Sequence, residues 1–220
     1  MKTKIFCDSA DYKTIKKLSS NPLVGGFTTN PSLMRLAGAK NYKNYSLKLL
    51  KVCKNKPISF EVFADEFNAM EKQAYKINSW GKNIYVKIPV INSKGIFTGR
   101  IINKLSKKGI NLNITAVYTP SQIRKILKNI SNNSKIIISI FAGRMGDAGK
   151  DPIPIIKEGV KLTKKMKKGI IQANGLIQKE PVFKTKHVAK TIHYIAELPL
   201  DVNVQFITLM ATKMPFIGRG

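Results

Sequence analysis

The sequence has few acidic residues and no long apolar run. Only 12 Asp and Glu residues accompany 39 Lys and Arg residues over 220 residues, which gives a formal net charge of +27. A membrane-spanning helix needs about 18 or more consecutive apolar residues, and no segment approaches that length. The sequence therefore predicts neither a transmembrane helix nor a membrane partner.

Cysteine is also scarce, with Cys7 and Cys53 as the two examples. Two unpaired thiols without metal-ligand spacing indicate neither a disulfide framework nor a zinc site, and they favour a reducing compartment. The N-terminal stretch MKTKIFCDSAD lacks the apolar centre of a signal peptide. We therefore expect a cytoplasmic protein without a leader.

The positive charge is a weak indication of nucleic-acid binding. Strongly basic proteins attract nucleic acid, anionic membranes or phosphorylated metabolites. Only five of the basic residues are arginines, however, and the lysines are spread over most of the sequence without interleaved aromatic residues. We do not expect nucleic acid to be a biological partner.

Short β-rich runs alternate with longer amphipathic segments along the whole chain. The expected strands are Lys4–Asp8, Val24–Thr29, Ile58–Ala64, Ile84–Pro89, Asn111–Val117, Lys135–Ala142, Gly169–Ala173 and Ile195–Pro199. The expected helices are Tyr12–Leu18, Tyr42–Cys53, Phe67–Ser79, Gly99–Lys107, Pro120–Ile130, Pro154–Lys167 and Lys184–Tyr194. Eight alternations predict a single α/β domain over residues 1–220, with the architecture of a (β/α)8 TIM barrel.

An open, doubly wound sheet is the alternative fold. Runs that are apolar at nearly every position, such as KIIISIFAG, suit any parallel sheet that is buried on both faces. A doubly wound nucleotide-binding sheet would have a glycine-rich turn after its first strand, and this sequence has none there. The barrel is therefore the preferred prediction.

Polar residues gather where the predicted strands end, which is where barrels carry their active sites. They are Asp8, Thr28, Thr29, Asn30, Glu61, Lys87, Asn113, Thr115, Ser139 and Arg144. Side chains alternate between the two faces of a strand, so each strand can direct one of them toward the barrel axis.

Each of these residues also has a purely structural interpretation. Asp8 could cap the helix that starts near Asp11, and Thr28 to Asn30 could form a turn and cap before Pro31. Glu61 and Lys87 could be a buried ion pair without chemistry, and Arg144 could bridge to Asp147. Lys87 is the exception, because burying a lysine in IYVKIPV without a function would be costly.

Seven strings in the sequence resemble the transaldolase family, in particular its short subclass, which includes fructose-6-phosphate aldolase. They are IFCDSAD, GGFTTNPS, FEVFA, IYVKIPV, LNITAVY, SIFAGRMGD and, more weakly, AELPLDV. The resemblance implies a (β/α)8 barrel, a Schiff base on Lys87, no cofactor and no metal. It also implies sugar phosphates as partners, a role in carbohydrate metabolism and a homo-oligomer.

The resemblance further implies a role for each site residue. Lys87 would form the iminium, Asp8 would take the proton of the C4 hydroxyl, and Glu61 would move protons through a water held by Thr115. The substrate would be bound by Thr28, Asn30, Asn113, Ser139, Phe141, Arg144 and Asn174. Glu61 and Phe141 are the transaldolase choices, whereas fructose-6-phosphate aldolase tends to have Gln and Tyr there.

The chain departs from the family pattern after about residue 169. The resemblance implies that the substrate phosphate is bound by Arg144 together with a serine and a basic residue after the seventh strand. This chain has Asn174 and Leu176 at the last two positions, so only Arg144 of the expected phosphate site is present. An alternative register would use Phe183 to Thr185. The segment after Asp201 does not resemble the family's C-terminal helix, either because it is a divergent cap or because a frameshift disturbed it, and this leaves the subunit number open.

Three functions remain open from the sequence. The leading prediction is transfer of a dihydroxyacetone unit from a ketose phosphate to an aldose phosphate. An aldolase-like enzyme acting on a different or non-phosphorylated sugar is favoured by Asn174 and Leu176. A barrel that binds sugars without turnover is disfavoured by the intact set of Asp8, Glu61 and Lys87.

Overall fold

The computed structural model describes residues 5–53, 55–166 and 170–173. These residues contain seven parallel strands: β1 (Ile5–Asp8), β2 (Val24–Thr28), β3 (Ile58–Glu61), β4 (Ile84–Pro89), β5 (Leu112–Val117), β6 (Ile136–Ile140) and β7 (Ile170–Ala173). The helices are α1 (Tyr12–Ser19), α2 (Pro31–Leu36), α3 (Tyr42–Cys53), α4 (Phe67–Asn78), α5 (Gly99–Lys107), α6 (Pro120–Asn129), α7 (Ala142–Asp147) and α8 (Ile153–Met166).

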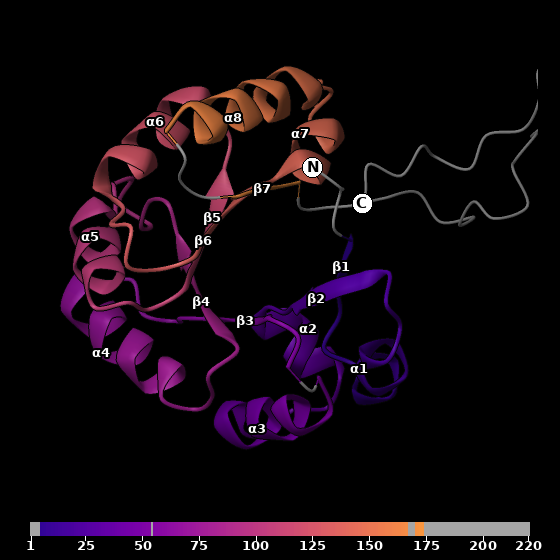
Figure 1. The fold of residues 1–220 in the computed structure, drawn as a ribbon. Helices are drawn as coiled ribbons and strands as arrows, with labels where there is room; N and C mark the ends of the chain where they lie inside the picture. The colour runs from indigo at the N-terminus through magenta and orange to yellow at the C-terminus, as the bar shows by residue number, and fades with distance from the viewer. Residues whose placement is uncertain (1–4, 54, 167–169, 174–220) are drawn as a thin grey trace, which may run out of the picture. The chain divides into compact units, whose positions relative to one another are not determined.

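The strands form one sheet in the order β1-β2-β3-β4-β5-β6-β7. Each strand pairs in parallel with the next one along the chain, and the order never reverses, so the doubly wound alternative is wrong. Figure 1 shows the strands along an arc, with α3, α4, α5, α6 and α8 on its outer side. The described residues thus form a curled parallel sheet, a partial barrel. The expected eighth strand (Ile195–Pro199) and the helix Lys184–Tyr194 lie outside them.

Most predicted elements are confirmed with small shifts at their ends, but two short helices were missed. The prediction ran β3 to Ala64 and β6 to Ala142, whereas the strands end at Glu61 and Ile140. Helix α7 starts at Ala142, and this is its one residue that falls within the predicted strand Lys135–Ala142. The sequence predicts a turn and cap at Thr28 to Asn30 without a helix after it; the cap at Asn30 is confirmed, and helix α2 follows with Pro31 in its first turn.

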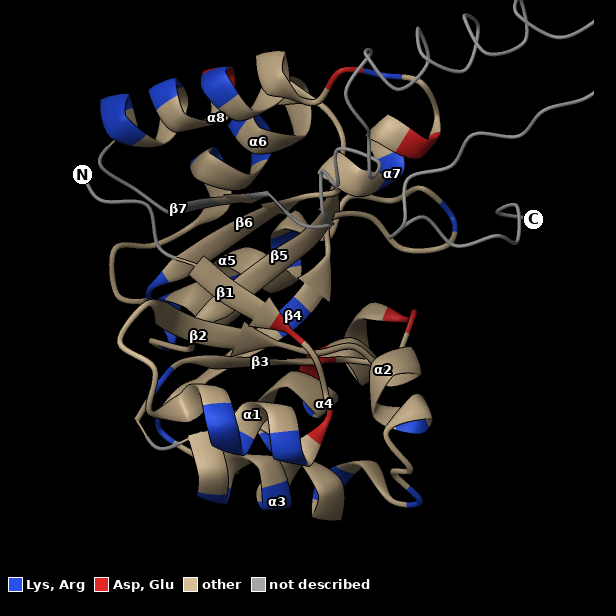
Figure 2. Cartoon of the chain, turned by 90° about the vertical axis from the view of Figure 1, so that its right-hand side faces the viewer, with Lys and Arg blue, Asp and Glu red and all other residues tan. Residues whose placement is uncertain are grey.

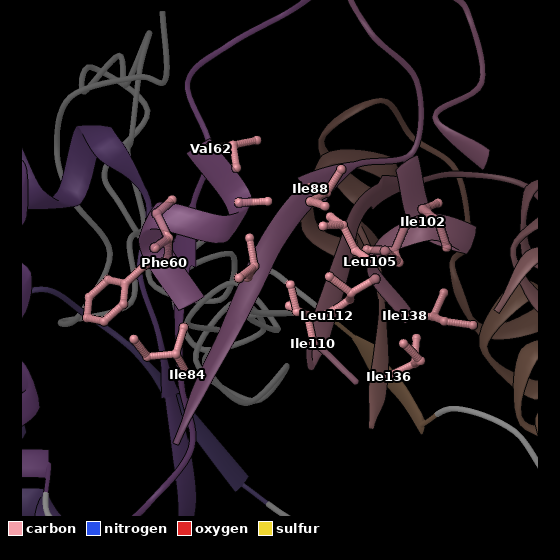
Figure 3. Close-up of a cluster of buried hydrophobic side chains, with 14 of the residues drawn as sticks. Phe60, Val62, Ile84, Ile88, Ile102, Leu105, Ile110, Leu112, Ile136 and Ile138 are labelled. Carbon is pink, nitrogen blue, oxygen red and sulfur yellow. The ribbon is translucent and has the colours of Figure 1, made fainter. Parts of the chain in front are cut away.

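The main core lies between the sheet and the outer helices. Alternate residues of β4, namely Ile84, Val86 and Ile88, are at most 1% exposed, and Ile102 and Leu105 of α5 are fully buried. Figure 3 shows these side chains packed together with apolar residues of β3, β5 and β6. Because side chains alternate along a strand, the remaining residues of each strand face the concave side of the sheet.

Among the described residues, many of the Lys and Arg side chains lie on exposed positions of the helices. Figure 2 shows the Lys and Arg colour along α1, α3 and α8. This placement fits the interpretation of the charge as a solvated outer surface. In the part of the chain that the structure describes, no helix is both long and apolar enough to cross a membrane.

Candidate active site

Strand register places the predicted polar residues on one face of the sheet. Asp8 pairs with Thr28, and Thr28 pairs with Ser59. Glu61 pairs with Lys87, and Lys87 pairs with Asn113. Directly paired residues of parallel strands project to the same side, so each of these two groups shares a face. The Asn113–Ser59 hydrogen bond described below joins the groups, and the apolar residues between them face the helices.

Lys87 is buried at the centre of this face. Its side chain is 6% exposed, and its Nζ lies 3.3 Å from Glu61 Oε2. The same nitrogen donates to the backbone carbonyl of Thr29, also at 3.3 Å. The Glu61 carboxylate and the Thr29 carbonyl together hold the Lys87 amine at one position. Removing either of them would leave the buried amine with one partner fewer.

A chain of hydrogen bonds orients the amide of Asn113. Its Nδ2 donates to Ser59 Oγ at 3.0 Å, and its Oδ1 accepts from Ser139 Oγ at 2.7 Å. Ser139 Oγ also lies 3.0 Å from Gln172 Oε1 of β7. Ser59 and Gln172 are site residues that the strand-end pattern does not predict; both lie at inward positions of their strands, and the two-residue period could have identified them.

Two threonine hydroxyls are buried on this face and have no hydrogen-bond partner in the part of the chain that the structure describes. Thr28 Oγ1 and Thr115 Oγ1 have no hydrogen bond among the described residues, and the residues are 2% and 1% exposed. A buried hydroxyl without a partner costs about 1–3 kcal/mol, which makes these positions candidates for contact with a bound molecule or water.

The backbone beside Thr115 is strained. Ala116 has φ of 59°, which is rare for a residue with a side chain, and the pairing of β5 with β6 shifts register between Ile114 and Val117. Irregularities of this kind concentrate at functional sites, because they redirect the neighbouring side chains.

Asp8 lies at the end of β1, within electrostatic reach of Lys87. Partial burial raises the pKa of the Asp8 carboxyl, and the positive charge of Lys87 opposes that rise. The suggestion that Asp8 caps α1 is wrong, because the cap is Asp11, whose carboxylate accepts from the backbone N–H of Thr14 at 2.7 Å. The carboxyl of Asp8 therefore remains available at the rim of the sheet.

The other predicted site residues do not all lie on the concave face of the sheet. Asn30 Oδ1 accepts from the backbone N–H of Leu33 at 2.8 Å, which confirms its role as a helix cap and leaves its Nδ2 as the group able to donate to a substrate. The ring of Phe141 packs edge-on against Tyr118. Arg144 was expected to end strand β6 but lies in helix α7 with an exposed side chain. Asn174 lies outside the described residues.

The described residues contain no group of three or more His, Cys, Asp or Glu side chains that could hold a metal ion. The polar groups that the structure does bring together are one amine, two carboxylates, the amides of Asn113 and Gln172 and several hydroxyls. Such a set is suited to proton transfer and to covalent chemistry on a carbonyl.

A curled parallel sheet with outer helices and a polar concave side is the arrangement of α/β-barrel enzymes. The family model for "Transaldolase/Fructose-6-phosphate aldolase" matches residues 5–211. The chain belongs to this family of aldolase-type enzymes.

Named relatives agree with this family. A "Probable transaldolase" of Dehalococcoides mccartyi is 34% identical over 161 residues, which cover 73% of this chain and 71% of the relative. A "Probable transaldolase" of Herpetosiphon aurantiacus is 30% identical over 219 residues, which cover 99% and 90%. A third, from Thermoplasma volcanium, is 36% identical over 157 residues, which cover 70% and 66%.

Proposed function

We propose that the protein is a transaldolase that transfers a dihydroxyacetone unit from a ketose phosphate to an aldose phosphate through a Schiff base on Lys87. The observation that carries the proposal is the buried Lys87 amine, 3.3 Å from the Glu61 carboxylate and close to Asp8. The proposal includes a closed (β/α)8 barrel formed by residues 1–220 as a single domain, working in the cytoplasm as a homo-oligomer.

The reaction starts with attack of the neutral Lys87 amine on the C2 carbonyl of the ketose. The carbonyl oxygen gains two protons, one that the amine loses and one from the general acid or solvent, and leaves as water, which gives an iminium. Asp8 then takes the proton of the C4 hydroxyl while the C3–C4 bond breaks and its electron pair moves into the iminium. An aldose leaves, and the enamine on Lys87 attacks the aldehyde of the acceptor while Asp8 returns its proton to the aldehyde oxygen. Hydrolysis of the new iminium releases the product ketose.

Glu61 and Thr115 handle the protons of the dehydration step. Glu61 already contacts the Lys87 nitrogen, so its carboxylate can accept the proton that the amine loses. The unpartnered hydroxyl of Thr115 can hold the water through which that proton reaches the carbinolamine oxygen. Both groups sit on rigid strands, which favours a fixed proton path.

The remaining polar groups bind the three-carbon unit and the phosphate. The amides of Asn30 and Asn113 and the hydroxyls of Thr28 and Ser139 can bond the sugar hydroxyls, and Phe141 would face the substrate. Arg144 would bind the phosphate, and Asn174 would complete this end of the site. No cofactor or metal enters any step.

An aldolase-like activity on a non-phosphorylated sugar is the second candidate. It is favoured by Asn174 and Leu176, which offer no positive charge for a phosphate. Comparing a ketose phosphate with its unphosphorylated form separates the two candidates, because the second predicts no preference between them.

Borohydride trapping tests the covalent step. The protein is incubated with fructose 6-phosphate, reduced with borohydride, digested and analysed by mass spectrometry. We expect a stable adduct on Lys87 and none in Lys87→Met. Adducts confined to other lysines would rule out the mechanism, and an absence of any adduct would favour the barrel that binds sugars without turnover.

A further inference from the structure

Tyr42 of α3 makes a two-way contact with the backbone of Glu61. Its hydroxyl accepts a hydrogen bond from the Glu61 N–H at 2.9 Å and donates one to the Glu61 carbonyl at 3.1 Å. Both bonds connect the helix to the last residue of β3. The sequence analysis did not select Tyr42.

The hydroxyl lies where strand β2 has stopped pairing with β3. The last backbone bond between these strands in the described region runs from Thr29 N to Ser59 O, at 3.2 Å. Backbone groups alternate sides along a strand, and Val62 N bonds to Lys87 O on the β4 side. The N–H and carbonyl of Glu61 therefore face the β2 side, where the chain has already turned into α2.

The Tyr42 hydroxyl thus replaces the missing strand neighbour. Burial raises the pKa of the Tyr42 phenol, and this effect outweighs the lowering by its hydrogen bond to the Glu61 backbone. The hydroxyl keeps its proton and can both donate and accept. The ring itself is fixed by edge-on contacts with Phe60, Phe63 and Trp80.

We infer that Tyr42 is a positioning residue, which acts by holding the end of β3 so that the Glu61 carboxylate stays beside the Lys87 amine. This inference rests on the proposed Schiff-base function. The carboxylate is attached to the residue whose backbone the phenol clamps, and it lies 3.3 Å from Nζ. A small displacement of a proton-transfer group can slow a reaction by roughly tenfold to a hundredfold.

The test compares Tyr42→Phe with Tyr45→Phe. Phenylalanine keeps the ring contacts of residue 42 and removes the hydroxyl. Tyr45 lies one turn later on α3, and its hydroxyl also meets two backbone groups, the carbonyls of Ala10 and Ala37, both at 3.1 Å. It does not contact Glu61, so it controls for the general loss of a tyrosine hydroxyl from this helix.

Two measurements are made on the full-length protein. The first is the rate at which borohydride traps dihydroxyacetone on Lys87, as a function of pH. We expect Tyr42→Phe to slow trapping roughly tenfold or more and to change its pH profile, while Tyr45→Phe keeps the wild-type profile. The second is hydrogen exchange of the Glu61 amide, which should become roughly tenfold faster in Tyr42→Phe alone.

The outcomes separate the two proposals. If wild type traps no ketose, the proposed function fails and this inference fails with it. If wild type traps normally and Tyr42→Phe traps at the same rate and pH dependence, this inference alone is wrong. Equal slowing in both variants would also overturn it, because the role of Tyr42 would then be general stability. Faster exchange with slower trapping, in Tyr42→Phe only, supports it.

Discussion

Single residues at this site combine burial with a nearby opposite charge. Lys87 and Glu61 form a pair whose amine is almost fully buried. A pair of this kind is poor evidence for stability, because desolvation offsets most of the attraction. A role in chemistry accounts better for its presence, and the same reasoning applies to Asp8, which is partly desolvated at the end of β1.

Asp8→Asn should make the protein more stable at neutral pH. The pKa of Asp8 is raised above its ordinary value of 3.8, so the folded state binds this proton more readily than the unfolded state does. The cost of burying the carboxylate is therefore present above the raised pKa and disappears as the pH falls toward 3.8. Thermal unfolding should show a higher Tm for Asp8→Asn at pH 7 and a smaller difference in acid.

Asp11→Asn provides the comparison of opposite sign. Hydrogen bonds from Thr14 lower the pKa of Asp11, so its carboxylate stabilises the folded state at neutral pH and loses that effect in acid. We expect a lower Tm at pH 7, and a loss that shrinks at low pH. A Tm of Asp8→Asn below wild type at pH 7 would contradict the assignment of Asp8 as a desolvated group.

At the level of elements, the carboxyl ends of the strands carry the candidate active site, and the amino ends carry contacts that stabilise the fold. The carboxyl ends carry the polar residues, the strained Ala116 and the short helices α2 and α7. The amino ends are closed by structural contacts. Lys56, which precedes β3, directs its Nζ to the carbonyls of Asn21 at 2.6 Å and Val24 at 2.7 Å, and more weakly to Leu18 at 3.4 Å.

Lys56→Met should reduce stability without changing catalysis. The substitution keeps most of the side-chain length but removes the charged donor, and hydrogen bonds to a charged group contribute about 1.5–3 kcal/mol. We expect the free energy of unfolding to fall by about 2 kcal/mol in urea titrations. Lys51→Met, on the exposed side of α3, should leave it unchanged.

The kinetic constants of Lys56→Met should match those of wild type, because Lys56 lies at the opposite end of the sheet from Lys87. A large fall in kcat with normal stability would show that the amino ends of the strands take part in the reaction. That result would contradict the separation of structural and chemical ends.

On the scale of the whole molecule, the dominant feature is the net charge of +27 of the full sequence. A field of this strength attracts anionic substrates from a distance, and salt weakens it. Under the proposed function the local phosphate contact is weak, because Arg144 is exposed on α7 and neither Asn174 nor Leu176 carries a positive charge. Phosphate recognition should thus combine a general field with a single arginine.

Raising the ionic strength from about 0.01 M to about 0.15 M should lower kcat/KM for a ketose phosphate, because the Debye length falls from about 30 Å to about 8 Å. The value for an unphosphorylated ketose should change little. Arg144→Ala should raise KM for the phosphate by roughly tenfold to a hundredfold at fixed salt, since one charged hydrogen bond is lost. A strong phosphate preference that survives both changes would place recognition elsewhere.

The sequence alone determined the alternation of strands and helices and the identity of the central lysine. Apolar strands interrupted by one polar residue are a local pattern, and IYVKIPV shows both the strand and the residue that is costly to bury there. The outward parity of Ile84, Val86 and Ile88 follows from the same two-residue period. These features depend on neighbours along the chain, which is why they could be predicted.

Only the tertiary structure decided which residues of different strands lie next to each other, because the two-residue alternation along a strand says nothing about its neighbours. The register of β3 against β4 brings Glu61 beside Lys87. Asn113 donates a hydrogen bond to Ser59, and Ser139 contacts both Asn113 and Gln172, so these contacts join strands that lie far apart in the sequence. Strand β2 ends before it reaches the level of Glu61, and the backbone N–H of Glu61 therefore donates to the Tyr42 hydroxyl instead of to a strand neighbour. Each of these contacts joins distant segments whose relative position is fixed only when the sheet curls and the helices pack against it.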